Sequence, residues 1–114
     1  MSTSLNTRSW PSYLDGQAKK LLIGGEWVPA RSGRTFDSIN PSTGEVIAQL
    51  AEGDAADIDR AVIAARRAFE GPWRKFTPIP RQNVLLKLAD LVERHFDQLR
   101  LLDVLDMGAP IRGW

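Results

Sequence analysis

Cysteine and histidine, two residue types that often carry out catalysis, are nearly missing from this 114-residue chain, which has no cysteine and a single histidine. Without a thiol there is no disulfide, no thiolate metal ligand and no cysteine nucleophile. His95 has no second histidine at metal-ligand spacing, and no G-x-S-x-G motif is present to supply a serine partner. We therefore interpret His95, beside Phe96 near an expected helix end, as a partly exposed structural residue.

Two other groups of residues resemble binding motifs, but a structural role explains each of them better. The acids Asp54, Asp57 and Asp59 lack the spacing and the closing glutamate of an EF-hand. They suit a helix start, where carboxylates cap the backbone and complement the positive end of the helix dipole. Gly24-Gly25 opens no helix that could bind a phosphate, so we interpret it as a tight turn.

The composition argues against several classes of partner. Fifteen Lys and Arg residues stand against 14 Asp and Glu, and the two signs are interleaved, so nucleic acid and anionic membranes are poor candidates. No apolar run approaches the roughly 20 residues of a membrane helix. The segment Met1–Gly16 has no signal-peptide core, although Arg8 and the scarcity of acids are also features of transit peptides, a less favoured alternative. We expect a cytoplasmic protein.

The tryptophans offer the last candidate for a binding platform. Trp27, Trp73 and Trp114 could stack on bases or sugars, but no basic groove accompanies them in the sequence. We therefore expect them to pack in a core or an interface.

The first half of the chain predicts a tail and two hairpins. Residues 1–20 lack helical or strand periodicity and are expected to form a flexible tail. Two short apolar runs then flank Gly24-Gly25, which predicts a hairpin of Leu21–Ile23 and Glu26–Val28. A second pair of extended segments, Thr35–Ile39 and Glu45–Leu50, flanks the turn Asn40–Gly44.

The second half predicts three helices. Asp54 caps the first, which ends at Gly71-Pro72; Thr77-Pro78 opens the second; Asp97 caps the third, which ends at Gly108 and Pro110. Each helix has an apolar stripe at intervals of three and four residues: Ile58, Ala61, Val62, Ala65 and Phe69 in the first, Val84, Leu85, Leu88, Leu91, Val92 and Phe96 in the second, and Leu99, Leu102 and Leu105 in the third. Two hairpins are marginal alone and each apolar stripe needs a partner, so we expect these elements to pack on something outside the 114 residues.

A series of motifs resembles the N-terminal region of aldehyde dehydrogenases, from about Leu21 to Ile111. The individual motifs are short, but their joint order and spacing are specific. They are, in chain order, Leu22–Val28, Ser32–Phe36, Ile39–Ala48, Ala51–Asp54, Asp57–Val62, Ala64–Phe69, Pro72–Arg74, Leu88–Glu93 and Leu105–Pro110.

The resemblance implies an α/β fold: N-terminal hairpins plus helices of the Rossmann-like cofactor-binding domain, incomplete, with residues 21–114 as a truncated part of the dehydrogenase domain. The family oxidises an aldehyde to a carboxylic acid with NAD or NADP, through a cysteine thioester, hydride transfer and a glutamate-activated water. These groups and the cofactor loop lie beyond Trp114 in the family. No catalytic or cofactor-binding residue is therefore assigned, and we expect no NAD(P) to bind this chain alone.

The same resemblance implies one ligand role within the chain. Some family members hold a structural monovalent cation with backbone oxygens before the Asn-Pro turn and with the aspartate of a Leu-Asp-x-Gly motif. Those positions are Ser38, Ile39 and Asp106 here, and a further family ligand lies beyond Trp114. The alternative for Asp106 is a helix-end acid with an ordinary hydrogen bond.

Three hypotheses for function follow. The first is an N-terminal fragment of an NAD(P)-dependent aldehyde dehydrogenase, inactive alone, from a family of homo-oligomers that act on small aldehydes. The second is a non-catalytic interaction module that docks on a full-length dehydrogenase paralogue. The third is an independent small domain with a different role.

Overall fold

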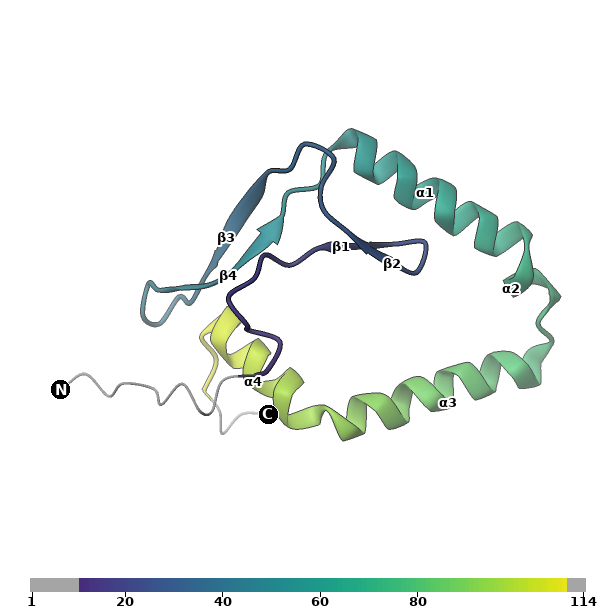
Figure 1. Cartoon of the computed structure of the whole chain (residues 1–114). Helices are drawn as coiled ribbons and strands as arrows, with labels where there is room; N and C mark the ends of the chain where they lie inside the picture. The colour runs from purple at the N-terminus through teal and green to yellow at the C-terminus, as the bar shows by residue number, and fades with distance from the viewer. Residues whose placement is uncertain (1–10, 111–114) are drawn as a thin grey trace.

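The computed structural model describes residues 11–110 and consists of two antiparallel hairpins followed by helices (Figure 1). The strands are β1 (Leu21–Ile23), β2 (Glu26–Val28), β3 (Thr35–Ile39) and β4 (Val46–Ala51). The helices are α1 (Ala55–Glu70), α2 (Pro72–Lys75), α3 (Pro78–Arg94) and α4 (Phe96–Met107). The expected α/β class is confirmed.

The first hairpin, β1–β2, turns at the predicted glycines. Gly24 and Gly25 have φ values of +62° and +82°, the left-handed conformation that a two-residue hairpin turn requires at both positions. The turn lies against α1, since a side-chain carbon on Gly24 would lie 3.8 Å from the Cβ atom of Ala64. The small residues of α1 therefore give the hairpin room to approach.

The second hairpin, β3–β4, has the predicted strands, although β4 begins one residue later than expected, at Val46. Lys19 pairs with its edge: the Lys19 amide donates to the Gln49 carbonyl at 2.8 Å, and the Lys19 carbonyl accepts from the Ala51 amide at 2.8 Å. A residue of the expected tail is thus bonded to the sheet. The flexibility predicted for residues 1–20 stays a prediction, and residues 1–10 lie outside the described range.

Helix α1 starts at a capping box, as its acids predict. The Asp54 carboxylate accepts from the Ala56 amide at 3.1 Å, and the Asp57 carboxylate accepts from the Asp54 amide at 3.1 Å. Asp57 also accepts from the Arg31 amide at 3.1 Å and is only 1% exposed. One buried carboxylate therefore joins the start of α1 to the loop that leaves β2.

A corner that the sequence did not predict separates α1 from α3. Helix α1 ends at Gly71 as expected, but the next residues form the short helix α2. Arg81 of α3 closes the corner, with its guanidinium 5.5 Å from the Trp73 ring centroid and a 3.3 Å hydrogen bond to the Trp73 carbonyl. Thr77 is the N-cap of α3 but makes no side-chain capping bond. One of the two usual donors is missing, since Pro80 at N3 has no N–H.

The predicted boundary between the last two helices was wrong. His95, not Asp97, occupies the N-cap position of α4, and Phe96 belongs to α4, not to the second helix. A single residue separates the helices: the His95 amide still donates to the Leu91 carbonyl of α3, and its carbonyl accepts from the Leu99 amide of α4. Asp97 consequently lies in the first turn, where its charge suits the helix dipole.

The elements form an open ring instead of a packed core (Figure 1). The radius of gyration is 17.7 Å, whereas a compact domain of this length has about 13 Å. Within residues 11–110, the buried apolar side chains are Pro11, Ala30 and Leu105. Most of the apolar stripe residues predicted on α1 and α3 are exposed, whereas Leu105 of the predicted α4 stripe is buried.

The buried link at Asp57 predicts an acid-dependent stability. Hydrogen bonds from the backbone amides of Asp54 and then Arg31 outweigh burial and lower the Asp57 pKa from its ordinary 3.8. A lowered native pKa stabilises the fold above pH 3.8, and this contribution is lost as the pH falls through the native pKa. Asp57→Asn should therefore lower the urea midpoint, followed by far-UV circular dichroism, at pH 7, and the deficit should shrink below pH 3.8.

The matched control is Asp59→Asn, which makes the same change at an exposed position of α1. We expect it to leave the pH profile close to that of the unaltered chain. An equal deficit in both variants at pH 7 would contradict the assigned role of Asp57.

Candidate functional site

The structure brings together two of the three residues predicted for a cation site. Ser38, in β3, donates a hydrogen bond through its Oγ atom to Asp106 Oδ1, in the last turn of α4, at 2.7 Å. The two residues are 68 positions apart in the chain. Ile39 follows Ser38 across an irregularity in the β3–β4 pairing, and its side chain is exposed. The predicted site thus lies where α4 meets the second hairpin.

The end of α4 is shaped to reach this hairpin. Gly108 caps the helix in the left-handed conformation, with φ of +69°, and its amide donates to the Val104 carbonyl at 2.9 Å. A Cβ atom on Gly108 would lie 2.8 Å from Pro41 Cγ and 3.0 Å from Ser42 Oγ. Only glycine therefore suits both the backbone conformation and the approach to the turn.

Asn40 stabilises the Asn40–Gly44 turn, against which the end of α4 packs. Asn40 is buried, and its Oδ1 atom accepts from the Ser42 amide at 2.9 Å. The Asn40 amide donates to the Glu45 carbonyl, and the Asn40 carbonyl accepts from the Gly44 amide, both at 2.8 Å. The surface under Gly108 is thus fixed by the turn's own bonds.

A cavity of about 230 Å³ adjoins Ser38 and Asp106, and Lys19 and Asp103 also line it. The Lys19 ammonium is engaged elsewhere: it lies 2.6 Å from the Asp15 carboxylate and 4.3 Å from the centroid of the Tyr13 ring. The hydrogen bond from Lys19 lowers the Asp15 pKa, which is consistent with an intact ion pair. Asp103 and Asp106 are therefore the acids next to the cavity whose charge Lys19 does not pair.

The electrostatics of this region favour a cation. Asp106 stands in the last turn of α4, where the helix dipole is negative, and residues 104–107 include no basic side chain. A hydroxyl and a carboxylate are hard oxygen donors of the kind that alkali and alkaline-earth cations take. Among residues 11–110, no three His, Asp or Glu side chains gather as a metal site. Any cation here would need hydroxyl and backbone oxygens as well.

A second cavity, which the sequence did not reveal, lies between β2 and the α3–α4 junction. It measures about 490 Å³ and is lined mainly by apolar side chains. Its walls are formed by Tyr13, Trp27, Leu91, Val92, Leu99 and Leu102, with His95 and Gln98 beside them. The apolar periodicity of the last two helices predicted its leucine and valine walls. Nothing near Trp27 in the sequence indicates that this side chain lines the same cavity as residues of α3 and α4.

The remaining predicted residues have structural surroundings. His95 is exposed at the junction of α3 and α4, as expected for a structural histidine. Trp73 stacks near Phe76 with ring centroids 5.5 Å apart, whereas Trp27 is 59% exposed. Trp114 lies outside the described residues.

No helix within residues 11–110 has the length and apolar character needed to cross a membrane.

Comparison with known proteins gives one consistent match in sequence. The sequence model of the aldehyde dehydrogenase family matches residues 27–113. A mitochondrial benzaldehyde dehydrogenase from Antirrhinum majus is 55% identical over 95 residues, which are 82% of this chain and 18% of that protein. Aldehyde dehydrogenase 1 from Tanacetum cinerariifolium is 44% identical over 113 residues, which are 98% of this chain and 23% of that protein.

The fold gives the same match. The structure of a Bacillus cereus aldehyde dehydrogenase in complex with NAD+ superimposes with a TM-score of 0.84 and 44% identity, over 88% of this chain and 20% of that one. The chain therefore spans about a fifth of the length of the relatives it matches.

The close approach at Gly108 predicts unequal effects of two glycine substitutions. Gly108→Ala and Gly33→Ala each force alanine into a left-handed conformation, at about 1–2 kcal/mol. A new Cβ at Gly33 meets nothing within 4 Å, but one at Gly108 overlaps Pro41. Gly108→Ala should therefore lower the free energy of unfolding, measured by urea denaturation, by more than Gly33→Ala does. Equal losses would show that α4 does not depend on this contact.

Proposed function

This chain belongs to the aldehyde dehydrogenase family, and from that premise we propose that it forms the N-terminal scaffold of an NAD(P)-dependent enzyme that oxidises aldehydes to carboxylic acids. The observation that carries the proposal is the fold match: over 88% of its length the chain has the shape of one part of a dehydrogenase that binds NAD+. The apolar stripes left exposed on α1 and α3 suit a scaffold whose remaining contacts lie on the rest of such an enzyme.

The chemistry of the family reaction needs groups that these 114 residues do not contain. A cysteine thiolate attacks the aldehyde carbonyl in the mechanism that the resemblance implies, and the chain has no cysteine. NAD(P), when bound to the whole enzyme, accepts the hydride. The role of this chain is to position elements: the Asp57 link fixes α1 against the loop after β2, and the Ser38–Asp106 bond fixes α4 against β3. We accordingly propose that the chain alone neither turns over aldehydes nor binds NAD(P).

A chimera tests this function. Residues 21–110 of this chain should replace the matching segment of the Bacillus cereus dehydrogenase and support NADH formation from aldehydes. We expect kcat/KM within about tenfold of the host, since no group in contact with the reacting atoms is changed and tenfold corresponds to only about 1.4 kcal/mol in the barrier. A chimera that melts cooperatively and binds NAD+ but forms no NADH would overturn the proposal.

A finer part of the proposal concerns the cation site. We propose that Ser38, Ile39 and Asp106 contribute oxygen ligands to a structural sodium or potassium ion in the whole enzyme. Support comes from the position of Asp106, whose carboxylate lies 2.7 Å from the Ser38 hydroxyl and therefore close to the residues before the Asn-Pro turn, and from the negative end of α4 at the same place. The ion would neutralise this cluster and stabilise the contact between α4 and β3.

Thermal unfolding of the chimera tests the cation site without relying on activity. The melting temperature should be higher in sodium or potassium chloride than in choline chloride of equal ionic strength, because binding to the native state stabilises it. Asp106→Asn should abolish this difference, since it removes the charge but keeps an oxygen that can accept from Ser38. The control is Asp90→Asn, an exposed acid of α3 away from the site. A cation effect that survives Asp106→Asn would refute the assignment.

A further inference from the structure

Helices α1 and α3 expose many large apolar side chains. On α1, Ile58, Val62 and Phe69 are each about 60% exposed. On α3, the stripe residues Val84, Leu85, Leu88, Leu91 and Val92 are 39% to 62% exposed. Soluble monomers rarely expose contiguous apolar patches of this kind, and such patches mark interaction surfaces.

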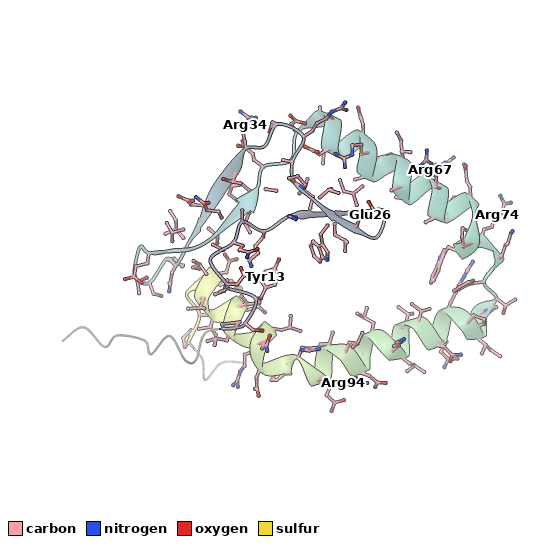
Figure 2. All side chains as sticks on the ribbon, in the orientation of Figure 1. Tyr13, Glu26, Arg34, Arg67, Arg74 and Arg94 are labelled. Carbon is pink, nitrogen blue, oxygen red and sulfur yellow. The ribbon has the colours of Figure 1, made fainter. Side chains whose placement is uncertain are left out.

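These stripes have little to contact within the described chain. Helix α3 is held mainly at its two ends, by Arg81 at the α2 corner and by the junction with α4 at His95 (Figure 1). Figure 2 shows Arg67 of α1, Arg74 of α2 and Arg94 of α3 along the outer edge of the ring. Arginines therefore lie along the outer edge, and the exposed apolar residues of α1 and α3 remain uncovered.

The fold match indicates what covers them. The chain matches 20% of the Bacillus cereus dehydrogenase with a TM-score of 0.84, so its elements already have the arrangement of one segment of a much longer enzyme. The surface that complements α1 and α3 is therefore the remainder of an aldehyde dehydrogenase.

We propose that this chain binds, as a separate polypeptide, to an aldehyde dehydrogenase that lacks the corresponding N-terminal segment, and that the complex regains NAD-dependent aldehyde oxidation. The inference rests on the proposed function, but it adds that no covalent connection between the two parts is required. An intact dehydrogenase is not the partner, because its own segment already fills the place. This distinguishes the proposal from docking on a full-length paralogue.

The apolar cavity of about 490 Å³ supplies the anchor. Trp27 stands at its wall opposite Leu91, Val92 and Leu99, and it is 59% exposed in the separate chain. Large aromatic side chains in apolar pockets contribute most to protein association. Side chains of the acceptor that enter this cavity would bury Trp27 and the α3 stripe together.

Co-expression tests the proposal. An affinity-tagged copy of this 114-residue chain is produced together with the Bacillus cereus dehydrogenase, either intact or without its first, matching fifth. The chain should co-purify with the shortened acceptor, and the purified complex should form NADH from aldehydes. The intact acceptor should not co-purify.

A matched pair of variants locates the surface. Leu88→Glu introduces a carboxylate into the apolar stripe of α3, whereas Lys87→Glu introduces the same group one position away on the exposed helix surface. We expect Leu88→Glu to weaken binding at least about tenfold, because an unpaired carboxylate is costly to bury. Lys87→Glu should bind like the unaltered chain. Leu88 is more than half exposed in the separate chain, so loss of folding does not explain the difference.

The covalent chimera separates the two proposals. An active chimera together with a shortened acceptor that remains insoluble or inactive beside the separate chain would overturn this inference and leave the proposed function standing. An inactive chimera that binds NAD+ would overturn both the proposed function and this inference. Co-purification of the intact acceptor in equal amount would overturn the assignment of the partner.

Discussion

The fold depends first on one buried carboxylate. Asp57 is almost fully enclosed and accepts backbone hydrogen bonds from Asp54 and Arg31, with the Arg60 guanidinium 3.5 Å away. A buried charge is tolerated only where such donors replace its water. Because Arg31 follows β2 and Asp54 precedes α1, the same group sets the position of both hairpins relative to α1. The apolar core cannot serve this purpose, since within residues 11–110 it consists of Pro11, Ala30 and Leu105.

A second polar contact closes the other side of the ring. Helix α4 reaches β3 through Ser38 and Asp106, and it rests on the Asn40–Gly44 turn through Gly108. An exposed hydrogen bond contributes little net stability, typically about 1 kcal/mol. The importance of this bond is geometric, because it fixes the C-terminal end of α4 against β3. Polar contacts are directional, and so they can fix an arrangement that apolar burial within the described chain is too small to fix.

Local signals in the sequence predicted most elements. Gly24-Gly25 and Asp54 act within a few residues, so the hairpin and the helix start could be read without knowledge of the fold. The start of α4 could not, because Asp97 is a good capping residue by type, whereas α4 begins two residues earlier, directly after its N-cap residue His95. The bond from Arg31 to Asp57 spans 26 positions and leaves no local pattern. Ser38 and Asp106 were paired only through the family resemblance, since nothing in their neighbourhoods links positions 68 apart.

The open ring also explains how a segment with so little core can be useful as a scaffold. In proteins, most of the stability of a helix such as α3 comes from the surface on which its apolar stripe packs. If α1 and α3 had to be ordered during binding, the free-energy cost of that ordering would reduce the affinity. The capping box, the Arg81 corner and the α4–β3 contact hold the stripes in place before that surface arrives. The polar links therefore determine where the helices lie, and in the proposed enzyme apolar contact with the other segments would determine how firmly they stay there.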